Sequence, residues 1–165
     1  MSNRPQHPPV ARVLFDEAHS EAWTIRPEVA RAMQPSHPGD SSYERAADAL
    51  RVRSFDVRAH EAGPLDTDAL AEAAVLVVAH PSDPKWERTV PESGPPLFSA
   101  AELDAIEAFV RDGGGLILLA EEEQEKYGNN VAALSERFGI GIANDVVSDY
   151  EHHHDHCEDF GLHSM

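Results

Sequence analysis

Cysteine is almost absent from this chain. Cys157 is the only cysteine in 165 residues, so no internal disulfide can form. Long hydrophobic runs are also missing, since no apolar stretch approaches the roughly 20 residues that a membrane-spanning helix needs. The first residues, MSNRPQHPPV, lack the hydrophobic segment of a signal peptide. We therefore expect neither a disulfide-stapled fold nor membrane insertion, and the cytoplasm is the expected location.

Positive charge is scarce as well. The chain has 13 Lys and Arg residues against 30 Asp and Glu, which gives a net charge of −17 at pH 7. A surface of that sign repels nucleic-acid backbones and anionic membranes, so neither is expected as a partner. The excess of carboxylates could serve a cation site, tolerance of high salt or solubility alone, and the sequence leaves these alternatives open.

The strongest fold signal lies between residues 98 and 140. Ser99 and Glu102 have the spacing of a capping box, and apolar residues then recur at helical spacing. The glycine run that starts at Gly113 ends this helix, because glycine adopts the left-handed backbone conformation without steric strain. The apolar run over 116–119 then predicts a strand that is buried on both faces, as in a parallel sheet.

Strands and helices alternate along the chain, which implies βαβ crossovers and a parallel sheet with helices on both faces. We therefore predict an α/β fold, a flavodoxin-like three-layer sandwich with about five parallel strands in the order 2-1-3-4-5. The expected strands are 12–15, 55–59, 74–79, 116–119 and 140–147, and helices are expected at 27–33, 42–50, 67–73, 99–112 and 129–138.

The predicted domain organisation has three parts: a flexible arm over 1–9, the α/β domain over 10–147, and a polar, histidine-rich tail over 148–165 that could begin a further region. The chain stops at Met165, before the final helix that such a fold usually carries. The alternatives are that the chain is a fragment, a short variant or the N-terminal part of a longer protein.

Polar side chains follow several of the predicted strands. Ligands of open α/β sheets bind outside the carboxyl ends of the strands, so we expect these side chains to converge on one ligand-binding edge. Asp16 could instead cap the next segment, its neighbours could face solvent, and His80 could belong to a simple turn. The candidate ligand-binding residues are Asp16, Glu17, His19, His80, Glu121 and Glu122.

The segment DYEHHHDH, from Asp149 to His156, is the densest group of potential metal ligands. Imidazole and carboxylate groups both bind zinc. Alternate residues of an extended segment face one side, so His152 and His154 could hold a divalent metal, such as zinc, together with His19 and Glu122. A solvated tail that captures metal adventitiously is the alternative.

Three sequence blocks together resemble the class I glutamine amidotransferase-like superfamily: AVLVVAHP, AELDAIEAFVRDGGGLILLAEE and NNVAALSERFGI. The resemblance is to the divergent, non-amidotransferase branch, as in ABC-transporter accessory, gliding-motility and intraflagellar-transport proteins. In the true amidotransferases, strand four ends in an elbow that bears a nucleophilic cysteine. Here Ala120, Glu121 and Glu122 occupy those positions, and Cys157 lies far downstream. The resemblance therefore implies the fold without the amidotransferase reaction.

Two functions remain in competition. The missing nucleophile favours a non-catalytic ligand-binding or protein-interaction domain on an amidotransferase-like scaffold, with a small molecule, a carbohydrate or a protein as its partner. The polar strand ends and the histidines favour a metal-dependent hydrolase, whose His and carboxylate site at the C-terminal edge of the sheet would activate a metal-bound water. Whether the protein is an enzyme is left open by the sequence.

Overall fold

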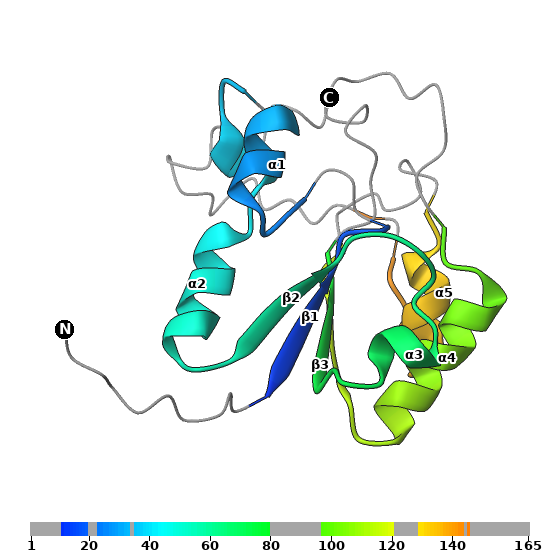
Figure 1. Ribbon diagram of the computed structural model, residues 1–165. Helices are drawn as coiled ribbons and strands as arrows, with labels where there is room; N and C mark the ends of the chain where they lie inside the picture. The colour runs from blue at the N-terminus through cyan, green and yellow to red at the C-terminus, as the bar shows by residue number, and fades with distance from the viewer. Residues whose placement is uncertain are drawn as a thin grey trace, which may run out of the picture.

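A computed structural model shows the fold of the chain (Figure 1) and describes residues 11–19, 23–33, 35–79, 97–120, 129–143 and 145. These residues contain one four-stranded sheet in the order β2-β1-β3-β4, and every pairing in it is parallel. The α/β class and the predicted strand order are therefore confirmed as far as the fourth strand. The strands are β1 (Arg12–Asp16), β2 (Asp56–His60), β3 (Val75–Val78) and β4 (Gly115–Leu118).

The predicted fifth strand over 140–147 is not shown. Residues 140–143 and 145 lie in no strand, and the rest of that range is outside the described residues. The five-stranded, flavodoxin-like order therefore stays a prediction, as do the domain boundaries. No helix in the described part of the chain is long and apolar enough to cross a membrane.

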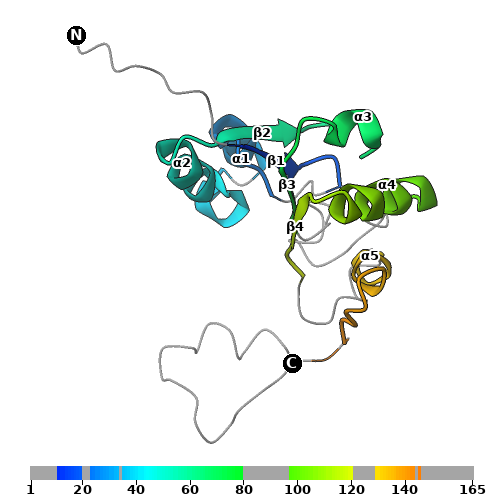
Figure 2. The same cartoon turned by 90° about the horizontal axis from the view of Figure 1, so that it is seen from below.

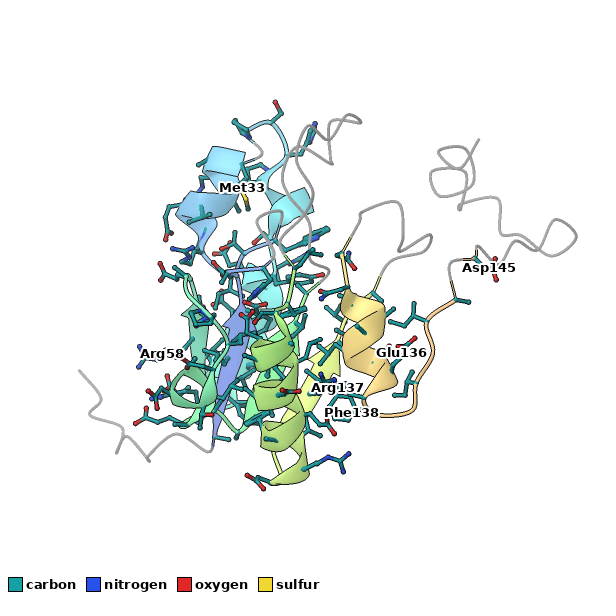
Figure 3. All side chains as sticks on the ribbon, turned by 90° about the vertical axis from the view of Figure 1, so that its right-hand side faces the viewer. Met33, Arg58, Glu136, Arg137, Phe138 and Asp145 are labelled. Atoms are coloured by element: carbon teal, nitrogen blue, oxygen red, sulfur yellow. The ribbon has the colours of Figure 1, made fainter. Side chains whose placement is uncertain are left out.

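Helices flank the sheet on both sides (Figures 1 and 2). The irregular stretch that the sequence left without a regular element contains a short 3₁₀-helix, η1. One side carries α1 (Pro27–Met33), η1 (Pro38–Ser41) and α2 (Glu44–Val52), and the other carries α3 (Thr67–Leu70), α4 (Ala100–Arg111) and α5 (Val131–Glu136). Figure 3 labels the last residue of α1, Met33, and the last residue of α5, Glu136.

Two hydrophobic cores follow from the alternation of side chains along the strands. On β1, Val13 and Phe15 enter the core beneath α2 with Ala47, whereas Leu14 enters the core beneath α3, α4 and α5. The second core is the larger, and its centre contains Leu76 and Ile106, which are fully buried. Burial of strand side chains on both faces is what makes the inner strands read as continuous apolar runs.

The expectation that the strand over 116–119 is buried on both faces is wrong at Ile117, which is 49% exposed. Leu116 and Leu118 pack against the core beneath α4 and α5. No residue of β4, however, belongs to the core beneath α2. The reason is that β4 is the last strand of the described sheet and lies beyond the part that α2 covers.

Candidate functional site

The described part of the candidate site lies at the carboxyl end of β1. Asp16, Glu17 and His19 are buried there, with exposed fractions of 2%, 8% and 7%. The alternative in which the two neighbours of Asp16 face solvent therefore does not hold. The other candidates lie outside the described residues, and their predicted roles are untested: His80, Glu121, Glu122, His152 and His154.

His19 is bracketed by two carboxylates. Its Nδ1 lies 3.0 Å from Asp16 Oδ2, and its Nε2 lies 3.1 Å from Glu102 Oε1. A protonated imidazole donates a hydrogen bond through each nitrogen, which suits this arrangement. Burial by itself lowers the pKa of His19, but the hydrogen bond and charge of Asp16, together with Glu102, raise that pKa above its ordinary value of 6.5. The geometry therefore favours the imidazolium form.

Glu102 holds the start of α4 as well as His19. Its Oε2 accepts hydrogen bonds from the Ser99 backbone N–H at 2.9 Å and from Ser99 Oγ at 2.7 Å, so the predicted capping box is confirmed. Its Oε1 accepts from the Leu65 backbone N–H at 3.0 Å. Burial raises the pKa of Glu102, but the bonds from Ser99 and Leu65 and the charge of His19 bring it below 4.5. Glu102 is thus held as a carboxylate.

An aromatic ring closes this group from one side. The ring of Phe98 stacks on the imidazole of His19, with centroids 4.4 Å apart and planes inclined by 29°. The Asn130 side chain binds the Phe98 backbone. The side-chain bond to the first turn of α5 comes from Asn129, whose Oδ1 accepts from the Val131 N–H at 3.2 Å.

The Glu17 side chain binds the turn that leads into α1. Its Oε1 accepts from the Ile25 backbone N–H at 2.8 Å, and its Oε2 lies 2.8 Å from Arg26 Nε. Arg26 also reaches Glu61, with Nη1 2.7 Å from Oε2. Asp16 makes a local turn, as its capping alternative predicted, because its Oδ1 accepts from the Ala18 N–H at 3.1 Å. These carboxylates are therefore already occupied by partners from this chain.

Sequence reasoning missed three members of this group: Glu102, Phe98 and Asn130. Each has a sufficient local explanation, in the capping box, in the apolar lead into α4 or in the start of α5. Glu102 and Phe98 meet His19, and Asn130 holds the Phe98 backbone, because the fold brings the starts of α4 and α5 to the end of β1. That is a tertiary property, and no spacing in the sequence signals it.

A metal could be held only by ligands with free lone pairs. No group of three or more His, Cys, Asp or Glu side chains is placed to hold a metal ion among the residues that the structure describes. Both ring nitrogens of His19 face carboxylates. The remaining predicted ligands, Glu122, His152 and His154, are outside the described ranges, so the metal prediction stays a prediction.

Comparisons with known proteins cover most of the chain and not only the residues around His19. A family model described as the IFT52 GIFT domain matches residues 53–158, more than half of the chain. A solved structure, the "mmIFT52 N-terminal domain", is similar with a TM-score of 0.53 and 18% sequence identity. The match covers 86% of this chain and 52% of that one, so the chain spans about half the length of the solved structure. At this identity the likeness shows the fold alone. No curated protein matches.

Proposed function

Because this chain belongs to the family of IFT52 GIFT domains, we propose that it is a non-catalytic protein-interaction domain of the intraflagellar-transport type. The finer proposal is that its scaffold is amidotransferase-like and lacks the nucleophilic cysteine. The all-parallel sheet supports that scaffold, and the Ala120-Glu121-Glu122 sequence at the elbow position supports the missing nucleophile.

One observation carries the non-catalytic assignment: each ring nitrogen of His19 is engaged by a buried carboxylate of this chain. A general base or a metal ligand needs a lone pair that can reach a substrate or an ion. An imidazolium held between Asp16 and Glu102 has none. The group instead joins the end of β1 to the start of α4, which is a structural role.

The proposed partner class is protein. The family is named after a component of intraflagellar transport, and transport complexes assemble by protein–protein contacts. A small-molecule or carbohydrate ligand at the strand ends is the alternative within the same proposal. The cytoplasm predicted from the sequence, or a cilium, is the compartment that this proposal implies.

The test combines activity with reconstitution. Purified chain is assayed for glutamine hydrolysis and for esterase, phosphatase and peptidase activity, with and without added zinc, beside His19→Gln. Partners are captured from the native organism with the wild type and with Ala47→Asp, which disrupts the core because Ala47 is fully buried. We expect no turnover above the His19→Gln background. We also expect a captured protein that rebinds when both components are purified.

Turnover that disappears in His19→Gln would overturn the proposal and favour the metal-dependent hydrolase. Capture that is equal for the wild type and Ala47→Asp would also overturn it, since a misfolded domain cannot present a specific surface. No observation within the described ranges favours the hydrolase, so it stands only as this outcome of the test.

A further inference from the structure

A second feature lies at the amino ends of the strands, opposite the end that holds the His19 group. A hollow of about 410 Å³ opens between α3 and α4, where β3 and β4 begin. Both helices lie side by side on the same face of the sheet in Figures 1 and 2. The lining is mainly apolar and includes Leu70, Ala73, Ala74, Ala108, Phe109 and Gly114. None of these residues takes part in the His19 group.

The floor of this hollow explains the glycine run. Gly113 has φ +103° and supplies the left-handed residue that ends α4. Gly114 is required for another reason, because a Cβ on it would lie 2.3 Å from Phe109 Cζ. The aromatic ring that lines the hollow therefore sits directly on the Gly114 backbone. The block FVRDGGG, conspicuous in the sequence, builds this floor.

The rim is negatively charged. Asp112 lines the hollow and is exposed, and its carboxylate has no hydrogen bond or ion pair in the part of the chain that the structure describes. It follows the last residue of α4, where the helix dipole adds negative potential. The nearest cation on that helix, Arg111, is already held by Glu107, with Nη2 2.7 Å from Oε1. The hollow thus combines an apolar floor with the negative charge of Asp112, which has no cationic partner among the described residues.

We propose that this hollow is a docking site for a partner-protein segment that inserts an aromatic or large aliphatic side chain beside a Lys or Arg. The inserted side chain meets Ala108 and Phe109, and the adjacent cation meets Asp112. A second copy of this chain is a poor occupant because two molecules of net charge −17 repel each other. The inference deepens the proposed protein-interaction function by giving it a surface and a partner chemistry.

The first experiment uses peptides as probes. The full chain, labelled with ¹⁵N, is titrated at low ionic strength with Lys-Gly-Trp-Gly-Lys, with the same peptide carrying Ala for Trp, and with one carrying Glu for both Lys. We expect amide shifts centred on Asp112, Gly113 and Gly114 for the first peptide only. Equal shifts from the Ala peptide would reduce the effect to charge alone and would overturn the inference.

The second experiment fills the hollow. Ala108→Phe places a ring into it from an exposed position of α4, so the fold is retained. The matched control is Ala101→Phe, which is exposed on the same helix and does not line the hollow. We expect Ala108→Phe to weaken peptide binding at least tenfold, Asp112→Asn to weaken it severalfold, and Ala101→Phe to leave it unchanged. Equal weakening by the two Phe variants would contradict the inference.

The same variants separate this inference from the function on which it rests. If the protein captured by the wild type is also captured by Ala108→Phe with unchanged affinity, the hollow is not the docking site and the interaction function stands. If the wild type captures nothing that rebinds, the interaction function fails whatever the peptides show. Loss of the reconstituted partner in Ala108→Phe and its retention in Ala101→Phe support both.

Discussion

Asn130 holds the backbone of Phe98 from both sides. The Phe98 N–H donates to Asn130 Oδ1 at 3.0 Å, and Asn130 Nδ2 donates to the Phe98 carbonyl oxygen at 2.7 Å. The ring of Phe98 in turn stacks on His19. Phe98 thereby links the start of α5 to the end of β1.

We predict that Asn130→Ala lowers the free energy of unfolding by about 1–3 kcal/mol, because two backbone groups of Phe98 lose their partner in a partly buried place. Urea denaturation measures the change. The comparison is Asn129→Ala, which removes the helix cap at Val131, with an expected loss of about 1 kcal/mol. Equal losses would mean that the bonds to Phe98 contribute nothing beyond ordinary capping.

The His19 group predicts a stability that depends on pH. The groups that face His19 are Asp16 and Glu102. Although burial opposes it, they raise the folded-state pKa of His19 above 6.5. The stabilisation from His19 is therefore complete below the ordinary, unfolded-state pKa of 6.5 and is lost as the pH rises through the folded value. Although burial opposes this too, the pKa of Glu102 is lowered, so its stabilisation is present above 4.5 and is lost as the pH falls through the folded value.

The two dependences together place the largest contribution of this pair between pH 4.5 and 6.5. Urea unfolding of the wild type and of His19→Gln across pH 4–9 measures it. We expect the difference in unfolding free energy between the two proteins to be greatest in that window and to shrink on the alkaline side. In the window, His19→Ala should be destabilised by about 3 kcal/mol, since it leaves two buried carboxylates without their cation. A difference that is constant with pH would contradict the imidazolium assignment.

Gly114 gives a prediction about packing. Gly114→Ala should destabilise the protein by about 1–3 kcal/mol, because the added methyl would meet the Phe109 ring. The control is Gly141→Ala, where an added Cβ meets nothing within 4 Å. In a double-mutant cycle, Phe109→Ala should remove most of the penalty of Gly114→Ala. Additive losses would show that the ring is not what excludes a side chain at Gly114.

The metal prediction can be tested by examining the ligand at the strand end, His19, separately from the tail ligands, His152 and His154. Tag-free protein is dialysed against a chelator, reloaded with zinc, washed, and analysed by elemental mass spectrometry. We expect His19→Gln to retain the same amount of zinc as the wild type, because both nitrogens of His19 are engaged by carboxylates. Any zinc that is retained should instead decrease in His152→Ala and His154→Ala. Loss of zinc in His19→Gln would restore His19 as a ligand.

Local signals in the sequence predicted most of the elements. The capping box at Ser99, the glycine stop at Gly113 and the apolar run over β3 each determine structure within a few residues, and each is found in the structure. The exposure of Ile117 could not be predicted in this way. An apolar run shows that a strand is compatible with burial on both faces, whereas coverage depends on which helices reach it.

Of the candidate ligand-binding residues, the structure describes only those that follow one strand end. The rule that ligands bind at strand ends selected Asp16, Glu17 and His19, which lie buried after β1, and their binding of a ligand stays a prediction. The rule does not say what they contact. Glu102 and Phe98 reach His19 because α4 crosses beside β1, and each of them already satisfied a local pattern. Because a local pattern already explained Glu102 and Phe98, nothing in the sequence indicated their contacts with His19. The sequence therefore predicted free polar side chains after β1, whereas the structure shows side chains that already have hydrogen-bond partners.

The strand order has a consequence for synthesis. β2 and β3 each pair with β1, and β4 pairs with β3, so each described strand after β1 joins a neighbour that precedes it in the chain. No described strand has to wait for one that the ribosome has yet to make. The sheet can therefore assemble in the order of translation: β2 and β3 add to opposite sides of β1, and β4 then adds to β3.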